Sequence, residues 1–433
     1  MPSQPLPGFR DFYPADLAFR THLFETWRRA CVRYGFEEFD APILEPLELY
    51  TAKSGAEIVG QLYNFRDKGE REIALRPELT PTVARMVAAR AGGMKKPIRW
   101  FSIGPMYRYE RQQRGRLREF FQLNCDLIGE PGPLADAEVI ALAIDLMRGF
   151  GLGPAEVRVR MSDRRITTAL LDALGQTEAQ REVHFQVLDK VARTPAEVSR
   201  EKLKLAGVSE SAIDRVLGLS RPAGWEGLEQ RLGAEPAVRA AAAPLFAVKQ
   251  ALDQMGLGEF VDFDLTIVRG LAYYTGTVFE VFDTGRSHRA IAGGGRYDEL
   301  LGLLGGVELP AVGFAIGDVV LGELLRERGL APDAPAAVDV FLAAVTVEDG
   351  GPLLALAHQL RDAGCRVEYS LRAEAVGKQL KLADARQARF AVVIGPDDRA
   401  RGEVQLKDLR TTSQRAVAVA QLAEELRRAL LAG

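Results

Sequence analysis

The stretch from Ile267 to Leu301 reads IVRGLAYYTGTVFEVFDTGRSHRAIAGGGRYDELL. Residues 277–282 are mostly β-branched or aromatic, which predicts a strand, and residues 283–287 predict the turn that follows it. The triple glycine at 293–295 allows close backbone approach or positive φ where side chains would clash. The pattern therefore predicts an antiparallel hairpin with a tight corner. This hairpin carries side chains suited to recognition, namely Arg269, Tyr273, Tyr274, Arg296 and Tyr297.

The composition indicates a chain of two to three domains. Its 433 residues are 47% hydrophobic and 27% charged, enough for a large core and a polar surface. Three widely separated cysteines argue against a disulfide framework and predict a reducing, cytoplasmic setting. No apolar run approaches the roughly 20 residues that span a bilayer, and the first residues lack a signal-peptide pattern. With a net charge of −3, any site for a polyanion must be a local patch.

The pattern of hydrophobic residues divides the chain into two predicted domains. Residues 98–107 and 119–128 are predicted strands within a first domain of residues 1–330. Helical spacing dominates from about 164 to 256, which predicts a helical insertion. A segment rich in proline and small residues around 331–335 predicts a linker.

Residues 336–433 alternate strands with helices, which predicts a small α/β domain. Its predicted strands are 338–345, 367–369, 390–394 and 403–408. Its predicted helices are 353–363, 376–388 and 416–431.

Residues 104–120, GPMYRYERQQRGRLREF, hold the strongest local charge. Five arginines lie in or beside the loop between the two strands, against only Glu110 and Glu119: they are Arg108, Arg111, Arg114, Arg116 and Arg118. Guanidinium groups match phosphate oxygens bidentately, so the loop is predicted to grip phosphates. The alternative is a solvated hairpin tip.

The strand after this loop has one polar face. Gln122, Asn124 and Asp126 share that face by the period of two, and apolar side chains take the other. Such a face is either a solvent face or the floor of a pocket for a small polar ligand. Earlier in the chain, Glu78 either pairs with Arg76 or holds an ammonium group.

Taken in order, these motifs resemble those of the histidyl-tRNA synthetases, a family of class II aminoacyl-tRNA synthetases. The resemblance runs from Gly8 into the C-terminal domain, nearly the whole chain. Its motifs are LRPELT (75–80), GPMYRYER (104–111), GRLREFFQLNCD (115–126), RGLAYYTGTVFE (269–280) and GGGRYD (293–298). The segments VGKQLKLA (376–383), FAVVIG (390–395) and VQLKDL (404–409) resemble the family's anticodon-binding domain.

The resemblance implies an α+β fold. A catalytic domain on an antiparallel sheet flanked by helices would carry the helical insertion, and a C-terminal α/β anticodon-binding domain would hold a mixed sheet. The implied activity is that of a histidine–tRNA ligase, which activates histidine with ATP and transfers it to the 3′ end of tRNA(His). The implied partners are ATP with Mg²⁺, L-histidine, tRNA(His) and a second copy of the chain, in the cytoplasm and without a membrane.

The resemblance also implies roles for individual residues. Arg108 would grip the α-phosphate of ATP, and Glu110 and Arg116 would help to hold the nucleotide. The implied histidine-binding residues are Glu78, Thr80 and Gln122 for the α-amino group, with Asp126, Tyr273, Tyr274 and Tyr297 around the imidazole. The implied catalytic residues, which neutralise charge as the carboxylate meets the α-phosphate, are Arg269 and Arg108. No protein side chain is implied as a metal ligand, since magnesium would sit on the β- and γ-phosphates.

Three positions depart from the family pattern. Ala272 stands where an acid is usual, Asp126 stands where a glutamate is common, and Val320 stands where the third class II motif normally has an arginine that stacks on adenine. Either another group covers the adenine, or ATP binding is weakened or absent.

The departure at Val320 leaves two alternatives to an active synthetase. One is the regulatory subunit of ATP phosphoribosyltransferase in histidine biosynthesis, and the other is a non-catalytic synthetase paralogue. The segments that resemble an anticodon-binding domain, together with Glu78, Arg108, Gln122 and Arg269, favour the enzyme.

Overall fold

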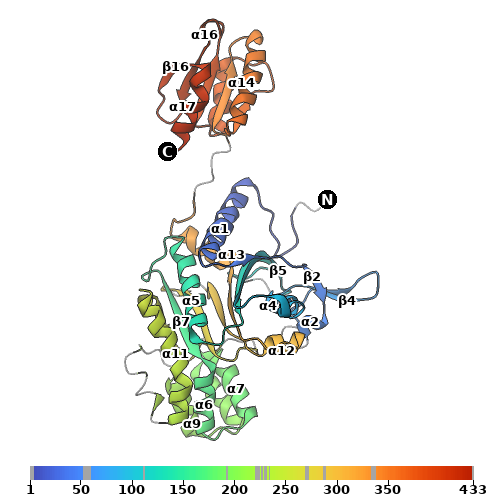
Figure 1. Cartoon of the computed structure of the whole chain (residues 1–433), viewed down its shortest axis with the longest axis vertical. Helices are drawn as coiled ribbons and strands as arrows, with labels where there is room; N and C mark the ends of the chain where they lie inside the picture. The colour runs from blue at the N-terminus through green and yellow to red at the C-terminus, as the bar shows by residue number, and fades with distance from the viewer. Residues whose placement is uncertain are drawn as a thin grey trace. The chain divides into compact units, whose positions relative to one another are not determined.

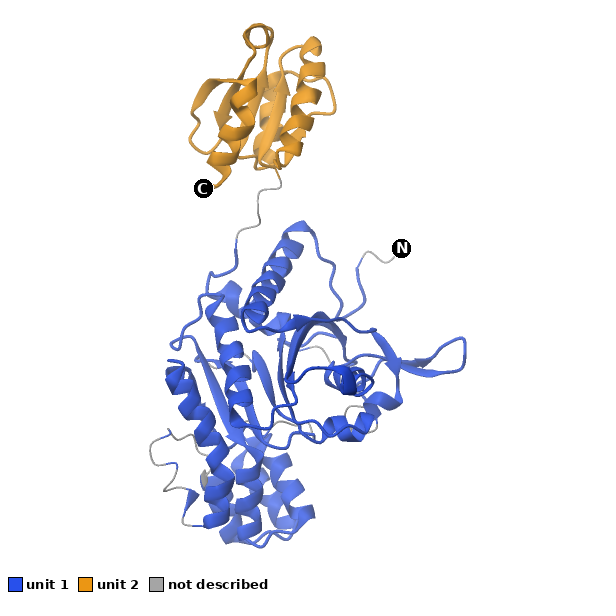
Figure 2. Ribbon diagram, in the orientation of Figure 1, with its two compact units in different colours: residues 1–332 blue, residues 333–433 orange. Residues whose placement is uncertain are grey.

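The protein is described here by a computed structural model. The described residues are 4–51, 60–110, 113–191, 194–219, 225, 228, 232–233, 235–268, 273–285, 289–332 and 338–431. The chain divides into two compact units, Met1–Pro332 and Asp333–Gly433 (Figure 2). No helix among the described residues is both long and apolar enough to cross a membrane.

The first unit contains both helices and strands. Its helices are α1 (Pro14–Arg33), α2 (Glu48–Thr51), α4 (Thr80–Ala88), α5 (Pro133–Arg148), α6 (Arg164–Ala173), α7 (Glu178–Leu188), α8 (Ala196–Leu205), α9 (Glu210–Leu219), α11 (Pro236–Gln254), α12 (Leu300–Gly305) and α13 (Asp318–Glu327), with short 3-10 turns η1 (Ala91–Gly93) and η3 (Gly258–Phe260). Its strands are β1 (Glu37–Glu38), β2 (Leu44–Pro46), β3 (Asn64–Arg66), β4 (Glu72–Leu75), β5 (Ile98–Tyr107), β6 (Glu119–Ile128), β7 (Val157–Asp163), β8 (Val261–Phe263), β9 (Thr277–Asp283), β10 (Ala292–Arg296) and β11 (Ala311–Gly317).

Within the described ranges, eight strands form the central sheet of this unit, in the order β1-β5-β6-β11-β10-β9-β7-β8. The outer pairs β1/β5 and β7/β8 are parallel and the inner pairs are antiparallel. The predicted strands 98–107 and 119–128 are confirmed as β5 and β6. The two strands of the predicted hairpin are confirmed as β9 and β10, which pair antiparallel with Gly294 opposite Phe279. The predicted corner at the triple glycine is wrong, because residues 293–295 lie inside β10. Residues 286–287 of the predicted turn lie outside the described residues. The α+β fold predicted from the sequence is therefore confirmed.

The two faces of the sheet bury different helices. The helix α5 lies against β6, β9, β10 and β11, and its side chains share one hydrophobic core with Leu123, Cys125 and Leu127 of β6. A second core joins α4 and α12 to Tyr274 and Tyr297. In Figure 1, α5 lies on one side of the central strands and α4 and α12 lie on the other. The apolar face of β6 is therefore turned toward α5, as its alternation predicted.

Between β7 and β8 the described chain is helical. The helices α6, α7, α9 and α11 gather at one end of the unit (Figure 1), and α11 packs on both α5 and α6. The sequence therefore inserts a helical layer without breaking the sheet, because β7 and β8 still pair in parallel across the insertion.

The second unit is a small α/β body. Its strands are β12 (Val340–Ala344), β13 (Val367–Tyr369), β14 (Phe390–Ile394), β15 (Glu403–Asp408) and β16 (Gln414–Ala418). Its helices are α14 (Gly350–Asp362), α15 (Val376–Ala385), α16 (Pro396–Arg401) and α17 (Val419–Leu431), with the turn η4 (Val347–Asp349). Among described residues the strand order is β13-β12-β14-β15-β16, and the sheet is mixed.

Some predicted helix bounds in this unit are wrong by up to three residues: the helix predicted over 353–363 is Gly350–Asp362, and the one predicted over 376–388 is Val376–Ala385. A closing helix was expected over 416–431, but residues 416–418 belong to β16 and the helix begins at Val419. The reason is tertiary, since β15 offers an edge to which Gln414–Ala418 pairs along its whole length. Local helical spacing could not reveal this pairing partner.

Candidate functional site

A cavity of 280 Å³ opens among β6, the end of β11, the start of α13 and the chain leading into β10. Four residues that the sequence singled out line it: Arg108, Glu110, Arg116 and Gln122. Phe120, Glu280, Arg289 and Val320 also line it, and sequence reasoning had not predicted a binding role for the first three. The predicted nucleotide-binding residues are thus brought together at one cavity.

The loop between β5 and β6 presents some of its arginines to this cavity. Arg108 Nε donates to the carbonyl oxygen of Pro77 at 3.0 Å, and its guanidinium carbon lies 5.4 Å from the ring centre of Phe120. Glu110 accepts a hydrogen bond from Arg116 at 2.5 Å. Two fixed guanidinium groups and one carboxylate therefore face a space suited to a polyanion with polar edges.

The remaining arginines of the loop behave differently. Arg114 forms an ion pair with Glu327 of α13, and Arg118 stacks over the ring of Tyr109 at 4.4 Å. Arg111 lies outside the described residues. The prediction of a phosphate-binding loop is therefore supported by the positions of Arg108 and Arg116, while Arg114 and Arg118 fasten the loop to its neighbours.

Beside the cavity, Glu78 lies at the end of the segment that follows β4. Its carboxylate accepts a hydrogen bond from the hydroxyl of Tyr273 at 2.9 Å, and the side chain of Thr80 also hydrogen bonds to Tyr273. Burial raises the pKa of Tyr273 well above its ordinary value, and the charge of Glu78 adds to the effect. Arg76 donates instead to the carbonyl oxygens of Pro105 and Ala41.

Asp126 is a buried carboxylate on the polar face of β6. Its Oδ1 accepts a hydrogen bond from the hydroxyl of Tyr297, and among described residues its Oδ2 has no partner. Burial raises the pKa of Asp126 to about 7, against the lowering effect of the Tyr297 hydrogen bond. An unpartnered buried carboxylate oxygen costs roughly 1–3 kcal/mol, so a ligand that donated a hydrogen bond to Oδ2 would recover that cost.

Tyrosine rings surround this carboxylate. The ring centre of Tyr273 lies 4.9 Å from that of Tyr274 and 5.9 Å from that of Tyr297. Tyr274 and Tyr297 are buried in the same core as α4 and α12. The predicted histidine-binding residues Glu78, Thr80, Asp126, Tyr273, Tyr274 and Tyr297 therefore form one connected cluster.

Two glycines make room for this cluster. Gly313 lies opposite Asp126 in the sheet, and a Cβ there would come within 2.3 Å of Asp126 Oδ1. A Cβ on Gly295 would come within 2.9 Å of Tyr274 Cδ1. The glycines of β10 and β11 thus allow side chains to lie flat on the neighbouring strands, which no larger residue would permit.

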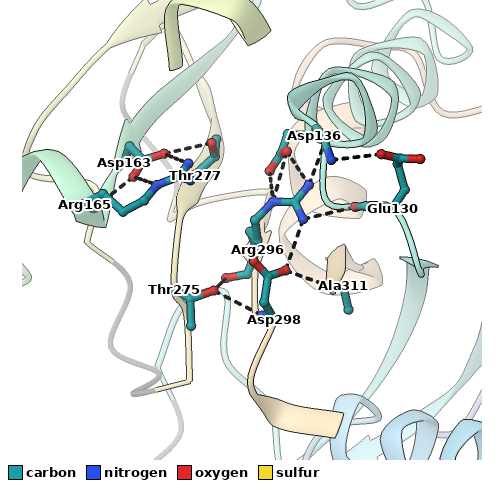
Figure 3. A network of polar contacts seen from close by, with 10 residues as sticks. Glu130, Asp136, Asp163, Arg165, Thr275, Thr277, Arg296, Asp298 and Ala311 are labelled. Atoms are coloured by element: carbon teal, nitrogen blue, oxygen red, sulfur yellow. Dashed lines mark hydrogen bonds and ion pairs between the residues drawn. The ribbon is translucent and has the colours of Figure 1, made fainter. Parts of the chain in front are cut away.

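A buried ion pair holds the strand end that carries Tyr297. Arg296 donates to Asp136 of α5 from Nε at 3.1 Å and from Nη2 at 2.5 Å, and to Asp298 at 3.1 Å (Figure 3). Asp298 in turn accepts from the backbone N–H of Ala311 at 3.0 Å. Arg296 therefore points away from the cavity and anchors the chain on both sides of Tyr297.

The polar face of β6 connects the arginine-lined cavity to the tyrosine cluster around Asp126. Gln122 opens into the cavity, and Asp126 lies four residues further along the same face, beneath the tyrosines. Between them, Asn124 Nδ2 and its cross-strand neighbour Ser102 Oγ are also buried without partners among the described residues. The floor can thus offer hydrogen bonds along a line from the cationic cavity to the buried carboxylate.

One of the departures from the family pattern, Val320, lies at the cavity, and two other positions that the sequence singled out are not described. Arg269 and Ala272 lie outside the described residues. Val320 is 8% exposed and lines the cavity near the start of α13. That helix start is held by Asp318, which accepts from the backbone N–H of Phe121 at 2.9 Å and from Arg10 at 2.8 Å.

Phe120, Glu280 and Arg289 join the cavity without having been predicted. Glu280 alternates with the buried residues Phe279 and Val281 along β9, a signal that the period of two carries, whereas Phe120 lies among half-buried residues at the start of β6 and shows no such alternation. Arg289 precedes β10 by three positions, and nothing in its local sequence indicated a cavity. Its place follows from the order of strands in the sheet.

Comparisons with known proteins show the family of this chain. The family model described as histidyl-tRNA synthetase matches residues 8–318, and the one described as anticodon binding domain matches residues 347–429. The chain is 48% identical over 415 residues to the histidine–tRNA ligase of Opitutus terrae, covering 95% of each chain. It is 40% identical over 416 residues to that of Halobacterium salinarum, covering 96% of each.

Among solved structures, the histidyl-tRNA synthetase of Nostoc matches with a TM-score of 0.85 at 26% identity, over 99% of both chains. Together the two family models match residues 8–318 and 347–429, and the curated relatives and the structural likeness extend over at least 95% of the chain. This chain therefore belongs to the histidyl-tRNA synthetase family of aminoacyl-tRNA synthetases.

Proposed function

We propose that this chain activates histidine with ATP to histidyl-adenylate and then transfers the histidyl group to the 3′ end of tRNA(His). The observation that carries the proposal is the shared floor of β6. One end of it, at Gln122, opens into the arginine-lined cavity, and the other end holds the buried, half-satisfied carboxylate of Asp126. A molecule lying along this floor would present one end to phosphates and the other to a carboxylate.

In this proposal the nucleotide occupies the cavity. Arg108 grips the α-phosphate, and Glu110 and Arg116 hold the remainder of ATP. Arg108 is pre-oriented by its hydrogen bond to Pro77, so little reorganisation accompanies the reaction.

Magnesium would enter this cavity bound to ATP. Among described residues no cluster of three acidic, histidine or cysteine side chains could hold a metal ion, while two carboxylates, Glu110 and Glu280, line the cavity. Mg²⁺ commonly binds through one or two carboxylates together with substrate phosphates and water. When bound, it would screen the charge of the β- and γ-phosphates.

Histidine occupies the tyrosine-lined half. Glu78, Thr80 and Gln122 receive the α-ammonium group, since a buried carboxylate with two polar neighbours matches three N–H donors. Asp126 Oδ2 accepts the imidazole N–H, and the rings of Tyr273, Tyr274 and Tyr297 enclose the imidazole. The negative carboxylate of Asp126 thereby acquires the partner that it lacks in the described chain.

The chemical step then needs no proton transfer. A carboxylate oxygen of histidine attacks the α-phosphorus, an O–P bond forms, and the bond to pyrophosphate breaks. Negative groups must approach one another, so fixed cations lower the barrier. We assign this role to Arg108 and to Arg269.

The division of labour follows the two units. Residues 1–330 would carry out catalysis, and residues 336–433 would bind the anticodon of tRNA, in line with the family models that match each part. We also propose a cytoplasmic homodimer. Apolar side chains that are 40–50% exposed on and beside the small β2-β4-β3 sheet support such an interface, namely Ile43, Leu44 and Phe65.

The regulatory-subunit alternative is less supported. The relative that is 48% identical over 95% of this chain carries the name histidine–tRNA ligase. The anticodon-domain match over residues 347–429 has no evident use in a subunit that does not bind tRNA.

Histidine-dependent exchange of pyrophosphate into ATP tests the proposal. The purified chain with magnesium should exchange label, and Arg108→Ala should reduce the rate by roughly 10²–10³-fold, the usual loss for one fixed charge that stabilises a transition state. A folded wild-type chain that gives no exchange would show that the proposal is wrong.

A further inference from the structure

We infer that Arg289 supplies the cation that covers the nucleotide in this chain, at the subsite where the family pattern has an arginine and this chain has Val320. The inference rests on the proposed function, since it concerns how ATP is held during histidine activation. It assigns a binding role to a residue that precedes β10 and that lies 31 positions before Val320.

The geometry brings the two positions to one point. Gly115 lies in the loop between β5 and β6, and a Cβ built on it would meet Val320 Cγ2 at 3.2 Å and Arg289 Cδ at 3.8 Å. The stem of Arg289 and the side chain of Val320 therefore flank the same glycine. Helix α13 carries Val320 where the family pattern has an arginine. Arg289, in the segment before β10, can bring a guanidinium group to the cavity instead.

The end of the Arg289 side chain reaches the nucleotide-binding loop. Its Nη2 donates to Oε1 of Gln113 at 2.5 Å, and Arg289 lines the same cavity as Arg108 and Arg116. Because Gln113 belongs to the loop that carries Arg116, Arg289 also ties that loop over the cavity.

The chemistry of the cavity explains why a cation is useful at this point. Phe120 offers one aromatic face, and Val320 offers only apolar surface. A planar guanidinium stacks on an aromatic ring and also attracts phosphate oxygens, which an aliphatic side chain cannot do. Arg108, Arg116 and Arg289 are the arginines in the described wall of the cavity, and Arg289 is the one beside Val320.

Direct binding of ATP by calorimetry, in the presence of magnesium, tests the inference on the full chain. Arg289→Ala should weaken ATP binding by about tenfold, the scale of one desolvated cation–π contact. Histidine binding to the same variant should stay within about twofold of wild type. Arg289→Lys should recover part of the loss, because lysine restores the positive charge but lacks the planar guanidinium group. Arg328→Ala, at the exposed far end of α13, is the matched control and should bind ATP as wild type does.

The double variant Arg289→Ala with Val320→Arg tests whether the two positions serve one subsite. It should bind ATP more tightly than Arg289→Ala alone; a double variant no better than the single one would contradict the shared subsite. Unchanged ATP binding by Arg289→Ala would overturn the inference, as would equal losses for ATP and histidine, which would indicate a disturbed fold.

The same measurement separates this inference from the proposed function. A wild-type chain that binds ATP through Arg289 but gives no histidine-dependent exchange would overturn the activity and leave the inference standing. A wild-type chain that binds no ATP would overturn both.

Discussion

The hydroxyl of Tyr297 donates a hydrogen bond to Asp126 across 171 residues of chain, and it satisfies only one of the two carboxylate oxygens. The other oxygen is buried without a partner among the described residues. A buried acceptor left open in this way costs stability, and a ligand that donates to it regains that cost. We therefore propose that this pair receives an N–H group of the ligand.

Replacing Asp126 by Asn should selectively weaken histidine binding. The amide removes the negative charge and can present an N–H where an acceptor is needed, so we expect the KM for histidine to rise by roughly 10–100-fold, the scale of one charge-assisted hydrogen bond. The KM for ATP should hardly change. Pyrophosphate exchange at varied histidine and ATP concentrations measures both, and an unchanged KM for histidine would remove Asp126 from the binding site.

The raised pKa of Asp126 should make stability depend on pH. Its folded-state pKa of about 7 lies above the unfolded value of about 4, because burial disfavours the charged form. The protonated form is therefore the one that the fold prefers: this stabilisation is complete below about pH 4 and is lost as the pH rises through about 7.

Asp126→Asn should lack this dependence. Relative to the variant, the wild-type free energy of unfolding should fall between pH 4 and pH 8 by up to about 4 kcal/mol. Urea unfolding of both proteins at the two pH values measures the difference. A constant difference would mean that Asp126 titrates normally in the folded chain.

Gly313→Ala should disturb the histidine half more than the nucleotide half. The new Cβ would lie 2.3 Å from Asp126 Oδ1 and 2.7 Å from the carbonyl oxygen of Cys125, so the carboxylate or the strand must move. We expect a loss of about 1–3 kcal/mol in stability, typical of overpacking, and a raised KM for histidine. Gly302→Ala in α12 is the matched control, since its nearest neighbour would lie 3.9 Å away. Similar behaviour of the two variants would contradict the close packing at Gly313.

Arg296→Met should destabilise the first unit by about 3–5 kcal/mol, because it leaves Asp136 buried without its charged partner. Arg401→Met, which breaks the more exposed pair with Asp398, should cost less than about 1 kcal/mol. The double variant Arg296→Met with Asp136→Leu should regain part of the loss. Denaturant unfolding measures all three, and equal effects of the first two variants would show that burial of the Arg296 pair is unimportant.

A chain ending at Pro332 should retain exchange and lose charging of tRNA. The division into units at this residue leaves every described residue of the cavity in the first unit. Exchange within about threefold of the full chain, with aminoacylation reduced by 100-fold or more, is the expected pair of results if the second unit supplies tRNA binding. Equal loss of both activities would contradict the proposed division of labour.

Much of the fold follows from local pattern. The ends of β5 and β6 agree with the prediction to the residue, because alternating side chains and a charged loop mark both strands without reference to the rest of the chain. The same period of two placed Gln122, Asn124 and Asp126 on one face before their neighbours were known. The family motifs, which follow one another along the chain, also predicted the family itself.

Only the tertiary structure decided which distant residues meet on that face. The sheet order places β11 between β6 and β10, and this order brings Tyr297 to Asp126 and Arg289 to Val320 and Gly115. It also turned Arg296 toward Asp136 and drew residues 416–418 into a strand. The amino-acid sequence by itself determined the strands, the faces and the chemical groups that each face carries, because these depend on neighbours in the chain. The contacts between faces depend on strand order and burial, and those arise only when the whole sheet has formed.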